Sequence, residues 1–355
     1  MMLSIILPAK NEAVNIGKLF NKLSKIKKKI KYEIILVDSQ SEDNTIRIAR
    51  NFSKIYKLNV KIFNSGNRDL SNSIIFALNR VKGDIVCVMD SDLQHPPEMI
   101  PLMLKTLKKK DADIVIASRF VKNAKVDFGL WRLFVSKVYR FLAHLFIPKT
   151  LYVKDPAAGF FIFRKKILKN IKLKPLGFKI LLEILAKAQY NKIEEIPFSF
   201  KERTKGKSKF NFKQTFIAFR HLLRLAKHQE EHKRFLKFCI VGISGLIVNQ
   251  GLLWLLTEFA RVFYLVSSIV AIESSIISNF ILNDLWTFKK ERKGKFLKRL
   301  LRFNIARIFA LGINFSILLG LTSLGMHYLI SNLFGIVVAT LFTYLSSLCW
   351  VWKWK

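Results

Sequence analysis

The chain has 355 residues and carries 61 Lys and Arg against 24 Asp and Glu, a formal net charge of +37 that is typical of proteins that bind nucleic acid or an anionic membrane surface. Its mean hydropathy of +0.23 is high for a chain in which 24% of the residues are charged, so apolar and charged residues must be segregated. No basic and aromatic module with the spacing of a nucleic-acid-binding motif occurs, which argues against a nucleic-acid partner and favours a lipid bilayer.

The first third of the chain alternates between apolar runs and helical patterns. Four segments begin with an apolar run and continue at helical spacing, and a fifth adds a strand: residues 2–23, 32–52, 58–83, 84–110 and 112–120. Continuously apolar strands that alternate with helices of about 10 to 15 residues indicate a parallel sheet covered on both faces. We therefore expect an α/β domain.

Three polar stretches lie where predicted strands end. Pro8–Glu12, Asp38–Asp43 and Asp90–Gln94 each follow an apolar run. Ligands of open α/β sheets bind beyond the carboxyl ends of the strands. The three stretches are therefore expected to line one site.

The third stretch carries the strongest chemical signal. In the sequence CVMDSDLQHPPE, Asp90 and Asp92 stand two residues apart at the tip of a predicted strand, and Gln94 follows. Paired carboxylates suit Mg²⁺ or Mn²⁺, ions that usually complete their coordination with substrate phosphates, and Gln94 offers an amide oxygen. A bare D-x-D is more often a solvated loop, and His95 is interpreted as a turn residue rather than a ligand. At a strand tip, the pattern predicts a divalent cation that holds a diphosphate.

Two later segments combine apolar residues at helical spacing with interleaved Lys and Arg. They cover about residues 128–148 and 210–232. Helices of this composition lie in the membrane interface. The alternative is that both are ordinary helices packed on the sheet.

The last third of the chain contains four long apolar stretches: Phe235–Phe259, Val262–Leu282, Phe303–Leu324 and Tyr328–Val351. Each reaches the ~20 residues that cross a hydrocarbon core of ~30 Å as a helix. A soluble bundle is disfavoured because its helices would show a polar stripe. Residues 236–249 and 301–314 resemble each other, which indicates two related helical hairpins. Glu273 and Arg307 lie within spans, where charges are costly, and we expect them to pair.

The charges of the loops predict the topology. Basic residues precede the first span, fill the loop 289–302 and close the chain, whereas the other two connections carry little beyond Arg261. The positive-inside rule places both termini in the cytosol, at the plasma membrane, and we see no cleavable signal. Cys87, Cys239 and Cys349 are scattered, so we expect core residues and neither a disulfide nor a zinc site.

Seven motifs stand in a familiar order: ILPAKNE, ILVDSQSEDNT, VMDSDLQHPPEMI, IASRF, DPAAGFFIFRK, GFKILLEIL and FKERTKGKSKF. With them, about residues 3–230 resemble the glycosyltransferase family 2 enzymes that act on polyprenyl phosphates, most closely the dolichol-phosphate mannosyltransferases. The four spans resemble the GtrA-like membrane domain. The resemblance implies a cytosolic, Rossmann-like GT-A domain over 1–230, which includes the interfacial helices, and a transmembrane domain of four helices over 233–355.

The resemblance also implies roles for single residues. Contacts to the nucleotide sugar are implied for Pro8, Ala9, Glu12, Asp38, Arg68, Asp90, Ser91 and Asp92. Contacts to the acceptor phosphate are implied for Arg119, Arg132, Ser136 and Arg203. Asp92, Gln94 and Asp90 would bind the metal, and Asp90, Asp92 and Arg119 would be catalytic.

The chain departs from the family pattern at three positions. Lys10 replaces an aromatic residue, Ser39 replaces a carboxylate, and Asp69 replaces a glycine. These changes concern base and sugar recognition and leave the metal site intact. Glu183, in an otherwise apolar helix, is given no catalytic role.

The implied reaction is inverting transfer of mannose from GDP-mannose to dolichyl phosphate, which gives dolichyl phosphate mannose and GDP. A phosphate monoester has a second pKa of about 6 and is ionised at neutral pH, so it needs orientation and charge pairing rather than a general base. Arg suits bidentate phosphate contact. Two alternatives are a glucosyl- or other glycosyltransferase that uses a UDP-sugar, and a lipid-linked sugar translocator with a nucleotide-sensing domain.

Overall fold

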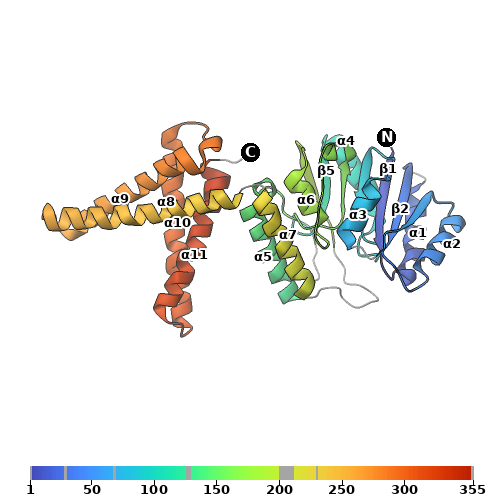
Figure 1. The fold of residues 1–355 in the computed structure, drawn as a ribbon, viewed down its shortest axis with the longest axis horizontal. Helices are drawn as coiled ribbons and strands as arrows, with labels where there is room; N and C mark the ends of the chain where they lie inside the picture. Colours follow the sequence, from blue (N-terminus) through green and yellow to red (C-terminus); the bar gives the residue numbers. More distant parts are fainter. Residues whose placement is uncertain are drawn as a thin grey trace. The chain divides into compact units, whose positions relative to one another are not determined.

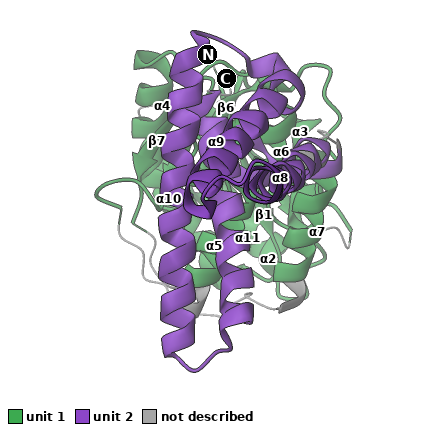
Figure 2. Cartoon of the chain, turned by 90° about the vertical axis from the view of Figure 1, so that its left-hand side faces the viewer, with its two compact units in different colours: residues 1–143, 149–225 green, residues 144–148, 226–355 purple. Residues whose placement is uncertain are grey.

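The computed structural model describes residues 2–27, 30–66, 69–124, 129–199, 212–228 and 231–352. Two compact units divide the chain: residues 1–143 with 149–225, and residues 144–148 with 226–355 (Figure 2).

The first unit is built on one mixed sheet flanked by helices (Figure 1). Its strand order is β3-β2-β1-β4-β6-β5-β7. The strands are β1 (Leu3–Ala9), β2 (Tyr32–Asp38), β3 (Val60–Asn64), β4 (Ile85–Val88), β5 (Ile114–Ser118), β6 (Phe161–Arg164) and β7 (Ile193–Pro197). The helices that flank the sheet are α1 (Ala13–Lys27), α2 (Thr45–Ile55), α3 (Leu70–Leu78), α4 (Ile100–Lys109) and α6 (Ile180–Lys187).

Side chains of one central strand point alternately into two cores. Leu3, Ile5 and Leu7 of β1 pack in the cluster that contains residues of α1 and α4. Ile6 packs in the cluster formed with α3 and α6, on the opposite face. Every residue of β1 and β2 is buried, as expected for strands covered on both sides. The predicted α/β class is confirmed.

The five strands predicted from the sequence run in one direction, but the sheet is mixed because it also contains β6, a strand that the sequence analysis did not assign. β6 runs antiparallel to both β4 and β5, whereas β7 pairs parallel with β5. An apolar run such as FIFR does not indicate the direction of a strand, because burial on both faces has the same pattern in either orientation. The reversal brings the loop that precedes β6 to the edge where the parallel strands end.

The two amphipathic segments form α5 (Leu130–Phe146) and α7 (Phe212–His228). In α5, Tyr139 and Ala143 are buried and Phe134 is exposed. In α7, Leu222 is buried and Phe216 is exposed. Each helix therefore packs through one face and leaves aromatic side chains on another, and contact of those faces with a membrane stays a prediction.

The second unit contains the predicted membrane helices. The four candidate spans found in the described residues are Lys233–Phe259, Tyr264–Thr287, Phe296–Ser323 and Tyr328–Val351. Helix α8 (Glu231–Trp254) packs along α9 (Tyr264–Leu282), and α10 (Phe296–Ser323) packs along α11 (Tyr328–Ser346), so two hairpins form (Figure 1). A π-helical turn follows α8, α9 and α11, at 255–259, 283–287 and 347–351.

The predicted pairing of two intramembrane charges is wrong. In the described part of the chain no ion pair joins Glu273, which is exposed on α9, to Arg307 on α10. Among the described residues of this unit, the buried acid is Asp284. Its carboxylate receives Arg299 through Nε at 2.9 Å and Nη2 at 3.1 Å, and the indole N–H of Trp352 at 2.8 Å.

Candidate active site

Polar residues from several strands meet at the carboxyl edge of the sheet. Pro8 and Ala9 end β1, Asp38 ends β2, Asp90 follows β4 by two residues, and Arg119 follows β5 directly. β1, β2 and β4 run parallel to one another, and β5 runs in the same direction because β6, between β4 and β5, is antiparallel to both. The carboxyl ends of these strands therefore lie at one edge of the sheet. Because β6 is antiparallel, the loop that begins at Asp155 enters the same edge.

The turns after β1 and β2 are bonded to each other. Thr45 Oγ1 accepts the backbone N–H of Glu12 at 2.9 Å, and Asp43 Oδ2 accepts that of Ala13 at 2.9 Å. Asp38 is fully buried, and its Oδ2 accepts the N–H of Ser41 at 2.9 Å. Glu12 and Asp38 are thus held rigidly where the resemblance places the nucleotide.

The turn that carries the two acids is tightly fixed. The hydroxyl of Ser91 donates to the carbonyl of Pro8 at 2.9 Å, and Oδ1 of Asp92 accepts the N–H of Gln94 at 3.1 Å. Leu93 has φ +64°, a left-handed conformation that is rare for a bulky residue and often marks a functional turn. Ser91, predicted to bind nucleotide, has its hydroxyl engaged with β1 and anchors the turn.

His95 supports the acidic turn from behind. Its Nδ1 accepts the backbone N–H of Asp90 at 2.9 Å, and its ring is buried and stacks on Phe160 at 5.2 Å between centroids. A Cβ on Gly159 would lie 3.1 Å from Cε1 of His95 and 3.5 Å from Oδ2 of Asp90. The imidazole, the glycine and the acid are therefore in close contact, and the prediction of His95 as a turn residue agrees with this geometry.

The donor set of the turn fits a substrate-completed metal site. Asp90 and Asp92 supply two carboxylates and Gln94 an amide, and in the described ranges no group of three or more His, Cys, Asp or Glu side chains forms a complete site. Mg²⁺ characteristically binds through one or two carboxylates and takes its remaining ligands from phosphates and water. The residues present therefore fit a divalent cation that arrives with its nucleotide.

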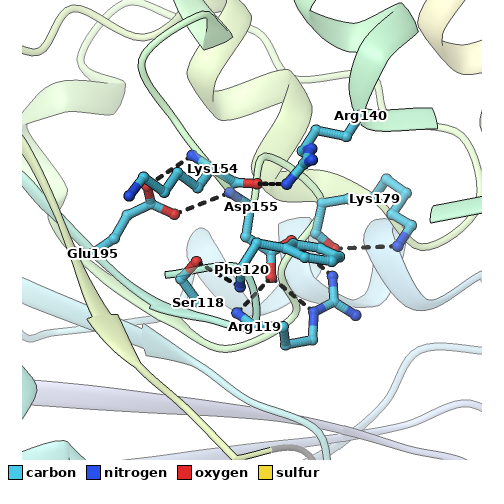
Figure 3. Close-up of polar contacts among 9 residues, drawn as sticks. Ser118, Arg119, Phe120, Arg140, Lys154, Asp155, Lys179 and Glu195 are labelled. Carbon is cyan, nitrogen blue, oxygen red and sulfur yellow. Dashed lines mark hydrogen bonds and ion pairs between the residues drawn. The ribbon is translucent and has the colours of Figure 1, made fainter. Parts of the chain in front are cut away.

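Arg119 is held by a buried carboxylate. Its Nε and Nη2 donate to Oδ2 and Oδ1 of Asp155, both at 2.7 Å, and its backbone N–H donates to Oδ2 at 3.1 Å (Figure 3). Burial disfavours both charges, but the ion pair outweighs burial: the pKa of Asp155 is lowered and that of Arg119 is raised. The charge of Asp90 also acts on Arg119, so the acidic turn and the guanidinium share one site.

Further charged groups surround this pair (Figure 3). Nη1 of Arg140 donates to the carbonyl of Lys154 at 3.4 Å, and Nζ of Lys179 donates to the carbonyl of Ala157 at 3.2 Å. Glu195 accepts the N–H groups of Lys154 and Asp155. Burial raises the pKa of Glu195. A cluster with this excess of cations is suited to bind a phosphate.

The structure places only some of the residues predicted to contact the nucleotide sugar or the acceptor phosphate. Arg68 and Arg203 lie outside the described residues, and of Arg132 only the backbone on α5 is described. Ser136 is half-buried on the same helix, one turn before Arg140. The i, i+4, i+8 spacing of Arg132, Ser136 and Arg140 was a signal for Arg140 that sequence reasoning missed.

Sequence reasoning also missed two acids: Asp155, which binds Arg119, and Glu195, which accepts hydrogen bonds from the backbone of Lys154 and Asp155. Asp155 stands in the DPAAG motif, but nothing in its spacing indicated Arg119 as its partner. Glu195 lies in the sequence IEEIP, where no local pattern distinguishes it from Glu194.

Comparisons with known proteins agree with this geometry. A family model described as glycosyl transferase family 2 matches residues 4–172, and one described as the GtrA/DPMS transmembrane domain matches residues 237–352. A dolichol-phosphate mannosyltransferase of Pyrococcus furiosus is 41% identical over 96% of this chain and 96% of its own length. One of Saccharomyces cerevisiae is 33% identical over 59% of this chain and 81% of its own length.

Solved structures share the fold of the first unit. Glucosyl-3-phosphoglycerate synthase of Mycobacterium tuberculosis, in complex with Mg²⁺ and UDP, aligns with a TM-score of 0.51 at 18% identity, over 64% of this chain and 79% of that chain. The same enzyme with Mn²⁺, UDP and phosphoglyceric acid aligns with a TM-score of 0.50. At this identity the likeness concerns the fold.

Proposed function

Since the chain belongs to glycosyltransferase family 2, and within it to the dolichol-phosphate mannosyltransferases, we propose that it transfers mannose from GDP-mannose to dolichyl or another polyprenyl phosphate with inversion and release of GDP. The observation that carries the proposal is the meeting of the acidic turn, 90–94, with the Arg119–Asp155 pair at one sheet edge. The chain is a membrane glycosyltransferase. The donor, the acceptor and the cytosolic orientation at the plasma membrane are parts of the proposal.

The acceptor side requires orientation more than proton transfer. A polyprenyl phosphate is largely ionised at neutral pH, and its oxygen can attack the anomeric carbon directly. Arg119, with Arg140 and Lys179 nearby, would hold the phosphate, and Ser136 with Arg132 and Arg203 would complete its contacts. Alignment and charge pairing at fixed positions account for the rate.

The donor side requires charge neutralisation of the departing diphosphate. Asp92, Asp90 and Gln94 would hold a Mg²⁺ or Mn²⁺ ion, which supplies that neutralisation when bound. Glu12 and Asp38, with the backbone of Pro8 and Ala9, would position the nucleotide, and Arg68 is the further predicted contact. His95 keeps the acidic turn in place through the Asp90 N–H.

The test is a panel of donors offered to membranes that contain the full chain. We expect label from GDP-mannose to enter the lipid fraction, and little label from UDP-glucose or UDP-N-acetylglucosamine. Preference for a UDP-sugar would move the assignment to the glucosyltransferase alternative. Nucleotide binding without label transfer from any donor would support a sensing domain of a translocator.

A further inference from the structure

We infer that Glu195 on β7 is a positioning residue for the acceptor phosphate, which acts through Asp155 and Arg119 without touching substrate. The inference rests on the proposed function, because it takes Arg119 as the residue that binds the phosphate. It concerns an acid that no motif indicated.

Both oxygens of Glu195 are engaged by consecutive backbone amides. Oε2 accepts the N–H of Lys154 at 2.7 Å, and Oε1 accepts the N–H of Asp155 at 3.0 Å (Figure 3). Two hydrogen bonds from neighbouring amides to one carboxylate fix the orientation of that peptide. The Cα of Asp155, from which its side chain extends, is thereby fixed.

The same carboxylate is linked to the strand that carries Arg119. β7 pairs parallel with β5, with Glu195 opposite Ile116, and the hydroxyl of Ser118 hydrogen-bonds the Glu195 carboxylate. Ser118 is the residue before Arg119. Glu195 therefore connects both ends of the ion pair: the residue that precedes the guanidinium and the backbone of the carboxylate that holds it.

This arrangement has a function that packing alone does not require. Burial of a carboxylate costs free energy, and an apolar side chain would fill the same position without that cost. The adjacent Glu194 differs: among the described residues, its carboxylate forms an ion pair with Lys192 at 3.7 Å. Glu195 instead makes three hydrogen bonds, from the backbone of Lys154 and Asp155 and from the hydroxyl of Ser118, beside the Arg119–Asp155 pair.

As a consequence, the plane of the Arg119 guanidinium is fixed before the acceptor binds. Nε and Nη2 of Arg119 form a fork on the two oxygens of Asp155, and a fork fixes rotation as well as position. When the peptide of Asp155 moves, the fork moves with it. Small errors in a preset site lower binding of the charged acceptor selectively, because the donor is held by other turns.

The experiment measures acceptor and donor KM for the full chain in detergent or nanodiscs. Glu195→Ala should raise the KM for dolichyl phosphate about tenfold, which is the effect expected if the misplaced Arg119 loses one hydrogen bond to the charged phosphate. The KM for GDP-mannose should change by less than about twofold. Glu195→Gln, which keeps one accepting oxygen, should raise the acceptor KM by about threefold. Glu194→Ala is the matched control and should match the wild type.

A double-mutant cycle separates positioning from general stability. In an Arg119→Ala background, Glu195→Ala should change the acceptor KM by less than about twofold, because the group through which it acts is gone. An equal effect of Glu195→Ala with and without Arg119, or an equal rise in both KM values, overturns the inference. If Glu195→Ala fails to fold, Glu195→Gln enters the same cycle.

Failure of the proposed function would be visible separately. If the wild type transfers no mannose, the proposed function falls, and the inference is then tested by direct binding of a short polyprenyl phosphate to the same variants. The inference is supported if Glu195→Ala binds the polyprenyl phosphate more weakly than the wild type and if this difference is absent in the Arg119→Ala background. Unchanged binding by Glu195→Ala contradicts the inference.

Discussion

The imidazole of His95 ties the acidic turn to the loop before β6. Its Nδ1 accepts the backbone N–H of Asp90 at 2.9 Å. The ring also contacts Gly159 and stacks on Phe160. One side chain therefore sets the position of Asp90 relative to the loop that supplies Asp155.

Loss of this contact should weaken metal use. We expect His95→Leu to raise the Mn²⁺ concentration for half-maximal transfer by about 10- to 100-fold, as for other residues that orient metal ligands. His95→Asn should lose less, because its amide oxygen can lie near the place of Nδ1 and accept the same N–H. The measurement is a Mn²⁺ titration of transfer rate. Identical half-maximal concentrations in wild type and His95→Leu would make His95 a packing residue only.

Single residues were predictable where a local pattern carries the chemistry. Asp90, Asp92 and Gln94 are neighbours in the sequence, so their spacing at the tip of a predicted strand predicts a metal site, and that assignment stays a prediction. Asp155 was not assigned because its partner Arg119 is 36 residues away and meets it only through the reversed strand β6. A pairing made by tertiary structure leaves no local signal.

At the scale of elements, helix α7 is attached to α6 through a buried acid. The carboxylate of Glu183 is fully buried and accepts the N–H of Lys174 at 2.6 Å, Nζ of Lys187 and Nε2 of His221 at 3.0 Å. Burial by itself would raise the pKa of Glu183, but the hydrogen bonds outweigh it and lower the pKa to about 2. Glu183 thus has a structural role, in line with the absence of an expected catalytic one.

The hydrogen bonds of Glu183 should make the stability of the fold depend on pH. Because the folded-state pKa is lowered, the contribution is complete above about pH 4.5 and is lost as the pH falls toward about 2. Its size is about 3 kcal/mol, since a tenfold change in proton affinity corresponds to about 1.4 kcal/mol. We expect the difference in melting temperature between wild type and Glu183→Gln to shrink as the pH is lowered through this range.

Glu194→Gln serves as the control for this series, since Glu194 is partly exposed. A difference between wild type and Glu183→Gln that stays constant from pH 6 to pH 3 would show that the carboxylate is not ionised against its partners.

In the membrane unit, the end of α9 depends on Asp284. Removal of one partner of a buried ion pair leaves an uncompensated charge, so Asp284→Ala should destabilise the unit by about 3–5 kcal/mol. Asp284→Ala with Arg299→Met should cost less than Asp284→Ala alone. Thermal unfolding of the full chain in detergent measures both, and Glu273→Gln is the control. A double variant less stable than Asp284→Ala alone would contradict the pairing.

Elements were predictable to different degrees. The length and hydropathy of the apolar stretches predicted the four membrane helices, and the internal repeat predicted both hairpins. The direction of β6 and the partner of each intramembrane charge were not predictable, because both depend on which elements pack together. The apolar pattern of FIFR, and the presence of Glu273 and Arg307 in spans, carry no such information.

At the scale of the whole molecule, the excess of positive charge agrees with the placement of Lys and Arg next to the membrane spans and on the amphipathic helices. Basic residues flank the spans and interleave with apolar ones on α5 and α7, both of which expose aromatic side chains such as Phe134 and Phe216. This distribution suits an anionic leaflet, which attracts each Lys or Arg by about 1 kcal/mol. Under the proposed function, a soluble nucleotide-sugar donor and a lipid acceptor would meet at one surface.

The central claim is that the acidic turn, together with a divalent cation, enables transfer. The most direct measurement is the Mn²⁺-dependent rate of mannose transfer to dolichyl phosphate by the full chain, for wild type, Asp92→Ala and Asp84→Ala. Asp84 is exposed and directly precedes β4, whose other end leads into the acidic turn, so it controls for loss of charge. We predict that Asp92→Ala lowers the rate by about a hundredfold or more while Asp84→Ala matches the wild type. Wild-type turnover by Asp92→Ala would contradict the account.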